Sequence, residues 1–184
     1  LPISSIYFTT NSAGEVNIPL KIAGNYTVIE RDAPENHLLS KNPTQNVTVV
    51  YNEVAKVTFF NDPYGSLRVQ KMSDTGEYLQ GATIQIKHIE SGATYTQQTG
   101  SAGVAFFDQL KPGAYEVREM AGVSGWLADT DTIQTINVVA GETSDATIIN
   151  KELPGLRITK YERGTMREMA NVTFEIFRDA ESLG

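Results

Sequence analysis

The chain has 184 residues, no cysteine and a formal net charge of −7. The absence of cysteine excludes disulfides, thiolate catalysis and Cys-ligated metals. An acidic chain without a basic run is not expected to bind nucleic acid. No stretch reaches the ~18 apolar residues that a membrane helix needs, so we expect no membrane insertion of these residues.

The sequence predicts β structure throughout. Short runs rich in Val, Ile, Thr, Tyr and Phe alternate with turns of Gly, Pro, Asn and Asp, and no segment keeps a helical period for three turns. Many short strands at regular spacing are typical of a β-sandwich with Greek-key connections. In chain order we expect strands over Tyr26–Glu30, Val54–Phe60, Leu67–Lys71, Ala82–Lys87, Gly103–Phe107, Ala114–Glu119, Thr132–Val139 and Thr143–Asn150.

Three polar residues recur 89 positions apart, and each ends a strand-like run: Glu30 and Glu119, Asn61 and Asn150, Lys71 and Lys160. Side chains in a strand alternate faces, so each shares a face with the hydrophobic residues two and four positions before it. A Lys, a Glu and an Asn are therefore expected to point into a sheet core. Lys and Glu are almost never fully buried unless they are paired, which makes these positions candidates for chemistry.

The 89-residue period predicts tandem repeats. We expect residues 1–62 to be the C-terminal portion of a first repeat, 63–152 a complete repeat, and 153–184 the N-terminal strands of a further one. Both chain ends then fall inside a repeat, because Leu1 is equivalent to Glu90 and Gly184 to Tyr95. Residues 153–184 of one chain are expected to complete residues 1–62 of a neighbouring copy, head to tail.

The central repeat carries further motifs. The strand Leu67–Lys71 is followed by Leu79-Gln80-Gly81-Ala82, then by a turn at Gly103 and the run Leu110-Lys111-Pro112-Gly113-Ala114-Tyr115, and the last strand ends Ile148-Ile149-Asn150-Lys151. This pattern resembles the Cna protein B-type (CnaB) domains of Gram-positive surface adhesins and pilins. Both flanks resemble it in part; in the C-terminal one, Asn171 stands at the Gly81 position and Ala170 at the Gln80 position.

The resemblance implies an Ig-like or prealbumin-like sandwich on a Gram-positive cell surface or cell wall. It also implies an isopeptide bond between Lys71 and Asn150 promoted by Glu119, with Lys160, Asn61 and Glu30 as the matching split set. From the residues alone, burial is expected to lower the pKa of Lys71, and its neutral amine would attack the Asn150 amide. Glu119 would bond the amide oxygen and carry protons to the leaving ammonia.

This reaction needs no metal or cofactor, and it turns over once, so we expect self-modification and no enzyme activity. The alternative is an ordinary buried polar cluster at the strand ends. For the split set the alternative is a half-site that does not react.

The expected role is a structural stalk segment of an adhesin or pilus-like protein, whose partners are the neighbouring repeats. The alternative is a module whose loops, around Trp126 or at Asp129–Asp131, contact a host matrix protein or glycan. Trp126 is expected to pack on the core rather than stack on a sugar. His37 and His88 are expected at solvated positions, and Asp129, Asp131 and Asp145 in a solvated acidic loop rather than a calcium site.

Overall fold

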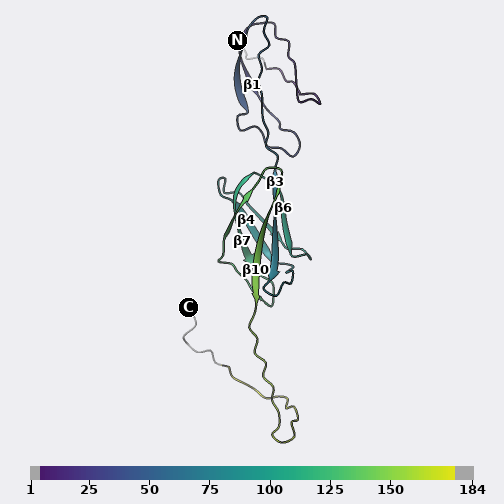
Figure 1. Cartoon of the computed structure of the whole chain (residues 1–184). Helices are drawn as coiled ribbons and strands as arrows, with labels where there is room; N and C mark the ends of the chain where they lie inside the picture. The colour runs from purple at the N-terminus through teal and green to yellow at the C-terminus, as the bar shows by residue number, and fades with distance from the viewer. Residues whose placement is uncertain (1–4, 177–184) are drawn as a thin grey trace.

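The computed structural model describes residues 5–176, and all its regular elements are strands (Figure 1). The expected all-β class is therefore confirmed for these residues. The strands are β1 (Gly24–Ile29), β2 (Thr44–Val49), β3 (Gly65–Ser73), β4 (Thr83–His88), β5 (Thr94–Gln98), β6 (Val104–Leu110), β7 (Gly113–Ala121), β8 (Trp126–Leu127), β9 (Gln134–Val138) and β10 (Thr143–Glu152).

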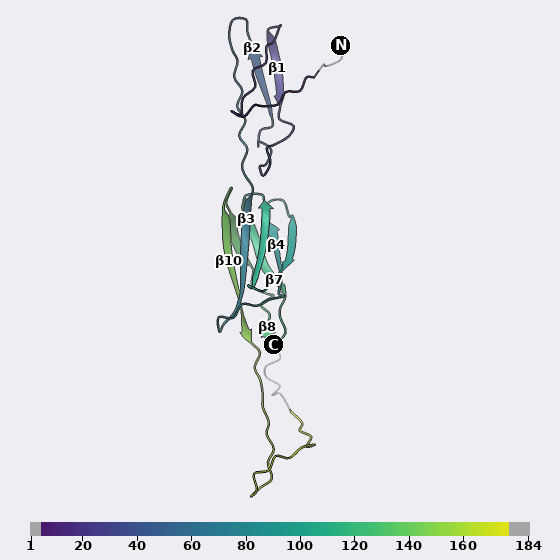
Figure 2. The same ribbon diagram turned by 90° about the vertical axis from the view of Figure 1, so that its right-hand side faces the viewer.

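Strands β3 to β10 form a sandwich of two four-stranded sheets, with the orders β6-β3-β10-β8 and β5-β4-β7-β9. The first strand, β3, and the last, β10, pair in parallel, with Ile148 opposite Lys71. All the other pairs in the sandwich are antiparallel. Because β3 and β10 run in the same direction, the chain reaches the sandwich at one end and leaves it at the other (Figure 2).

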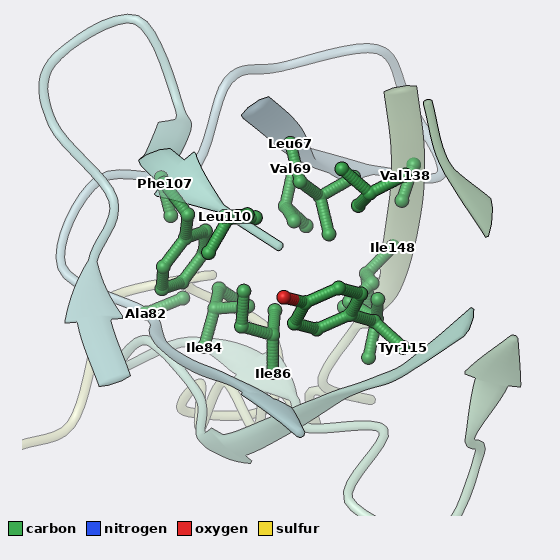
Figure 3. Packing of buried hydrophobic residues seen from close by; sticks show 13 residues of the cluster. Leu67, Val69, Ala82, Ile84, Ile86, Phe107, Leu110, Tyr115, Val138 and Ile148 are labelled. Atoms are coloured by element: carbon green, nitrogen blue, oxygen red, sulfur yellow. The ribbon is translucent and has the colours of Figure 1, made fainter. Parts of the chain in front are cut away.

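The core of the sandwich follows the alternation of side chains along each strand. Every second residue of β3 is buried, starting with Gly65 and ending with Ser73. Leu67 and Val69 from β3 face Ile84 and Ile86 from β4 across the core (Figure 3). This alternation places inward positions near the ends of β3, β7 and β10 inside the same core, and the predicted polar residues occupy these positions.

The segments on either side of the sandwich bury much less. Residues 5–62 contain one hairpin, in which β1 and β2 pair from Gly24–Val49 to Ile29–Thr44, and none of their side chains is fully buried. Residues 153–176 contain no strand and are almost wholly exposed. Figures 1 and 2 place these two segments beyond opposite ends of the sandwich.

The strand predicted over Val54–Phe60 is wrong for this structure, where these residues form no strand. Their alternating pattern is matched by β10, which lies 89 positions later and takes most of its hydrogen bonds from β3. The described part of the chain offers residues 54–60 no strand equivalent to β3. A strand without a partner leaves its backbone groups unpaired, so pattern alone does not make it form.

The solvated position predicted for His88 is also wrong, because its side chain is only 4% exposed. His88 is the last residue of β4 and shares the inward face of that strand with Ile84 and Ile86. Its Nδ1 contacts Ser91 Oγ at 2.8 Å, and its Nε2 is buried without a hydrogen-bond partner. The period-two rule, carried to the end of the strand, predicts this burial.

Candidate functional site: a buried Lys-Glu-Asn set

Strands of both sheets bring the predicted polar residues of the central segment together: β3 and β10 are adjacent in one sheet, and β7 belongs to the facing sheet. Lys71 lies near the end of β3, Glu119 near the end of β7, and Asn150 near the end of β10. Their exposed fractions are 0%, 1% and 1%. The sequence prediction that all three point into the core is therefore confirmed.

The three side chains contact one another directly. Lys71 Nζ donates a hydrogen bond to Asn150 Oδ1 and lies 3.4 Å from Glu119 Oε2. Asn150 Nδ2 donates to Glu119 Oε1 over 3.0 Å. An amine, an amide and a carboxylate thus form a closed set in which each group contacts the other two.

One detail differs from the expected arrangement, in which Glu119 bonds the amide oxygen. Glu119 instead accepts from the amide nitrogen, and Lys71 holds the oxygen. A carboxyl oxygen accepts hydrogen bonds, and the NH₂ group is the donor of the amide side chain, so the NH₂ group faces Glu119. The carboxylate therefore lies beside the nitrogen that would leave, and the amine lies beside the carbonyl that it would attack.

Burial shifts the Lys71 side chain toward its neutral form. Removal from water lowers the pKa of Lys71 from its ordinary value of 10.5, and this effect exceeds the opposing attraction of Glu119 and Asp129. A lower pKa raises the fraction of neutral amine, which is the nucleophilic form. The environment therefore favours the reactive state of Lys71.

Backbone groups hold the set in place, and sequence reasoning missed them. The Asp129 N–H donates to Glu119 Oε2 over 2.8 Å. The Lys71 N–H donates to the Gly103 carbonyl over 2.7 Å, and the Lys71 carbonyl accepts from the Leu79 N–H over 3.0 Å. Backbone N–H and carbonyl groups are present in almost every residue, so these contacts leave no signature in residue type and the sequence could not predict them.

The split set is brought together only in part. Asn61 Nδ2 donates to Glu30 Oε1 over 2.8 Å, and the Ser40 N–H donates to Glu30 Oε2 over 2.7 Å. Both contacts match those of Asn150 and Asp129 with Glu119, 89 positions later. Lys160 lies exposed in the segment beyond the opposite end of the sandwich and does not meet them (Figure 2).

The other sequence candidates do not gather into a site. Trp126 is half-buried in β8 and pairs with Glu152, and Asp145 forms an exposed ion pair with Arg68. Within residues 5–176 no three His, Asp or Glu side chains are placed to hold a metal ion. The same residues contain no helix long and apolar enough to cross a membrane.

Residues 65–152 match the family model of SpaA, described as a prealbumin-like fold domain. The match begins with β3 and ends with β10, so it contains all three buried polar residues. Residues 65–152 have a prealbumin-like fold. The expected prealbumin-like β-sandwich is confirmed for residues 65–152, which we call the prealbumin-like domain.

Solved structures of bacterial proteins, among them a minor pilin and a pilus adhesin, are similar to the chain at low identity. The Bacillus anthracis TIE protein is 18% identical over 72% of this chain and 35% of its own, with a TM-score of 0.46. The minor pilin GBS52 of Streptococcus agalactiae is 17% identical over 62% of each chain, with a TM-score of 0.44. A C-terminal fragment of the pilus adhesin SpaC from Lactobacillus rhamnosus GG is 18% identical over 73% of this chain and 61% of that one, with a TM-score of 0.46.

This chain therefore spans less than two thirds of the length of each of these three proteins. No curated protein matches the sequence.

Proposed function

We propose that the chain is a stalk segment of a Gram-positive cell-surface protein, adhesin or pilus-like, whose prealbumin-like domain locks itself with a Lys71–Asn150 isopeptide bond. The observation that carries the proposal is the buried contact of Lys71 with Asn150 beside Glu119. The amine, the amide and the carboxylate contact one another without access to solvent. Well-packed apolar residues would often stabilise the fold equally well at these positions, so the polar set points to a chemical role.

The reaction joins two side chains and releases one small molecule. Neutral Lys71 Nζ attacks Asn150 Cγ, and the new C–N bond forms as the bond from Cγ to Nδ2 breaks. Glu119 takes a proton from the attacking amine and gives one to Nδ2, which leaves as ammonia. The strands hold the reacting groups in contact, and such positioning can supply roughly 7–11 kcal/mol of the barrier.

The bond would suit a stalk because of the strands that it joins. Lys71 and Asn150 are 79 positions apart and belong to the first and last strands of the domain. By analogy with a disulfide, closing so long a loop stabilises the fold by up to about 4–5 kcal/mol in the chain-entropy model. The chain enters the domain through β3 at one end and leaves it through β10 at the other. A force that pulls on the two chain ends would therefore be carried by the crosslink between these strands rather than by the hydrogen bonds of the sheets.

We also propose that the domain is one of a tandem array of CnaB-type repeats. Contacts in residues 5–62 recur 89 positions later. Tyr26 and Tyr115 each donate a hydroxyl to the carbonyl four residues before, over 2.7 and 3.0 Å. Gln45 donates to the Thr58 carbonyl as Gln134 donates to the Thr147 carbonyl, over 2.8 and 2.7 Å. Such agreement favours a shared fold in both segments.

Short bonded junctions support an end-to-end arrangement of the repeats. The Tyr64 N–H donates to the Asn36 carbonyl over 3.1 Å, and the Gly141 N–H donates to the Tyr64 carbonyl over 3.1 Å. Tyr64 is thus tied both to the preceding segment and to the sandwich. At the other end the Leu153 N–H donates to the Gly125 carbonyl over 3.1 Å, 89 positions on from the first contact.

Mass spectrometry tests the proposal directly. The intact chain, trapped as a monomer in denaturant, should fall short of its sequence mass by one ammonia, and a digest should contain the peptides of Lys71 and Asn150 joined. The Asn150→Ala variant should carry its full sequence mass. A wild-type monomer with its full sequence mass would contradict the crosslink and show a sandwich without a covalent link.

A further inference from the structure

We infer that residues 122–129, which we call the strap, position Glu119 for the proposed crosslink while they are docked on residues 151–153. This inference rests on the crosslinking chemistry proposed above, and it adds a positioning contact outside the buried set. The contact joins the Gly125 carbonyl to the N–H of Leu153, the residue that follows the last strand of the domain.

The strap leaves the sheet that carries Glu119, reaches the edge of the facing sheet and returns to Glu119. It begins after β7 and includes β8, which belongs to the β6-β3-β10-β8 sheet. At the far end of the strap the Asp129 N–H donates to Glu119 Oε2 over 2.8 Å. The carboxylate and the N–H group that holds it are therefore 10 positions apart in the sequence, at the two ends of one loop.

The outer part of the strap is docked on the end of β10. There β8 pairs antiparallel with Lys151 and Glu152. The next residue, Leu153, donates its N–H to the Gly125 carbonyl over 3.1 Å. These residues follow Asn150 directly, so the strap links the carboxylate of the buried set to the strand that carries the amide.

A displacement of β8 would reach the carboxylate, because little of the chain lies between them. Ala128 alone separates Leu127, the last residue of β8, from Asp129. Ala128 is also packed against the start of the strap, since a Cβ added to Gly122 would lie 2.7 Å from Ala128 Cβ. With its two ends in contact the strap has little room to bend, so undocking at Gly125 would also displace the Asp129 N–H.

The two contacts of the strap recur together in residues 30–64. The Tyr64 N–H donates to the Asn36 carbonyl over 3.1 Å, 89 positions before the docking contact. The Ser40 N–H donates to Glu30 Oε2 over 2.7 Å, 89 positions before the contact at the far end of the strap. Apart from the glutamate, every residue type in these contacts differs from that of the strap, so the backbone contacts recur without the side chains. Their joint recurrence favours a connection between docking and the carboxylate.

The proposed reaction requires the two oxygens of Glu119 to face different partners. Oε1 accepts from Asn150 Nδ2 over 3.0 Å, and Oε2 lies 3.4 Å from Lys71 Nζ. The Asp129 N–H bonds Oε2 and thereby limits rotation of the carboxylate, whose terminal torsion is otherwise broad. Undocking of the strap would release this rotation. The bond from Lys71 Nζ to Asn150 Cγ would then form more slowly, with slower loss of ammonia, while the sandwich stays folded.

The test starts from the full chain made by chemical synthesis and kept in denaturant, so that the ammonia loss begins when dilution lets the chain fold. In the main variant an ester replaces the amide between Glu152 and Leu153, which removes the N–H and sets an oxygen against the Gly125 carbonyl. We expect the ammonia loss, followed by intact mass, to slow by roughly 10²-fold, because small misplacements of reacting groups can cost this much. The matched control has the same ester between Pro154 and Gly155. The Gly155 N–H donates no hydrogen bond within the described residues, so this control should react at the wild-type rate.

Two substitutions separate the backbone contact from the side chain of Leu153, which is 47% exposed. Leu153→Pro removes the N–H and should slow the ammonia loss as the ester does. Leu153→Ala keeps the N–H and should react at the wild-type rate. Equal slowing by the two substitutions would assign the effect to the side chain and overturn the inference.

Docking can be measured without the reaction in Asn150→Ala, which cannot form the crosslink. Trp126 of β8 is the only tryptophan of the chain, so its fluorescence reports on the strap. In this background the Leu153 ester should shift the Trp126 emission to longer wavelength and speed hydrogen exchange of the Asp129 amide. The denaturant midpoint of the sandwich should change little, which distinguishes positioning from a general loss of stability.

The outcomes separate this inference from the proposed function. A wild-type chain that keeps its full sequence mass would overturn the proposed function and this inference with it. If the wild type loses ammonia and the Leu153 ester reacts at the same rate, this inference alone fails. It also fails if the ester leaves Trp126 emission and Asp129 exchange unchanged, or if unfolded chain accounts for the slower reaction.

Discussion

Asn150 donates its amide hydrogen to Glu119 Oε1 over 3.0 Å, and this contact fixes which way the amide points. With Nδ2 turned to the carboxylate, Oδ1 is left for Lys71 Nζ. The groups that we propose as nucleophile, electrophile and proton carrier are thereby held in contact with one another.

Replacing the carboxylate should stop the reaction and leave a buried amine without its counter-charge. We expect Glu119→Gln to show the full sequence mass and to be less stable by about 3–5 kcal/mol in unfolding free energy than Asn150→Ala, the uncrosslinked variant that keeps the buried pair. Mass spectrometry and denaturant unfolding measure the two effects. Glu116→Gln is the control: Glu116 pairs with Lys87 at 3.6 Å with both side chains partly exposed, and it should change stability by no more than about 1 kcal/mol. If Glu119→Gln still lost one ammonia, Glu119 would have no catalytic role in the crosslinking reaction.

Removing the Lys71 amine should separate the contribution of the crosslink to stability from the effect of the buried amine. Lys71→Met keeps an unbranched side chain of similar length in the core and leaves the contact between Asn150 and Glu119 intact. We expect no ammonia loss and a stability lower than wild type by up to about 4–5 kcal/mol, the loop-closure contribution. Glu119 keeps its hydrogen bonds from Asn150 Nδ2 and the Asp129 N–H in this variant, so Lys71→Met should unfold at a higher denaturant concentration than Glu119→Gln. The reverse order would contradict this account of the site.

The turn at Gly103 should control where Lys71 lies. A Cβ at Gly103 would come 2.5 Å from the Lys71 carbonyl oxygen, and the residue has a φ of +67°. We expect Gly103→Ala to displace the end of β3 and to slow or abolish the loss of ammonia. Gly76→Ala is matched for backbone strain, with a φ of +93° and no atom near the added Cβ. It should cost about 1–2 kcal/mol and leave the crosslink complete. Equal crosslinking in the two variants would show that Gly103 does not position Lys71.

The uncrosslinked domain should become more stable as the pH rises toward 10. In Asn150→Ala the amine and carboxylate remain, and burial lowers the pKa of Lys71 below 10.5 in the folded chain. Between the folded value and 10.5 the unfolded chain binds more protons, so the free energy of unfolding increases with pH. Above pH 10 the opposite contribution of Tyr115 begins, because burial raises the pKa of Tyr115 to about 12 from 10.0.

This pH dependence is measured by denaturant unfolding at a series of pH values up to 10. The double variant Asn150→Ala with Lys71→Met lacks the titrating amine and is the control, for which we expect a flatter profile. Identical slopes in the two variants would contradict a lowered pKa at Lys71.

Alternation along single strands was enough to predict the inward side chains of the central segment. Lys71, Glu119 and Asn150 are buried as their positions in β3, β7 and β10 require. The orientation of the Asn150 side-chain amide was not predictable, because such an amide can turn either its oxygen or its NH₂ group toward Glu119. The backbone support from Asp129 and Gly103 was not predictable from residue type either.

Strand formation was predicted less well, because it depends on partners rather than on local pattern. Residues 54–60 and 143–150 have similar alternation, yet only the second run is a strand, alongside β3. The hairpin of β1 and β2 forms because its two strands satisfy each other. His88 shows an error in a strand end: the strand was expected to end at Lys87 and His88 to be solvated, whereas β4 continues to His88, whose side chain is buried.

The span of 79 positions between Lys71 and Asn150 also bears on how the domain meets proteases. Once the two side chains are joined, residues 71–150 form a covalent ring. A single cut at an exposed turn inside the ring, such as Gly92 or Gly141, opens the ring without dividing the molecule. The chain before Lys71 stays connected to the chain after Asn150, and two cuts within the ring are needed to release a fragment from it.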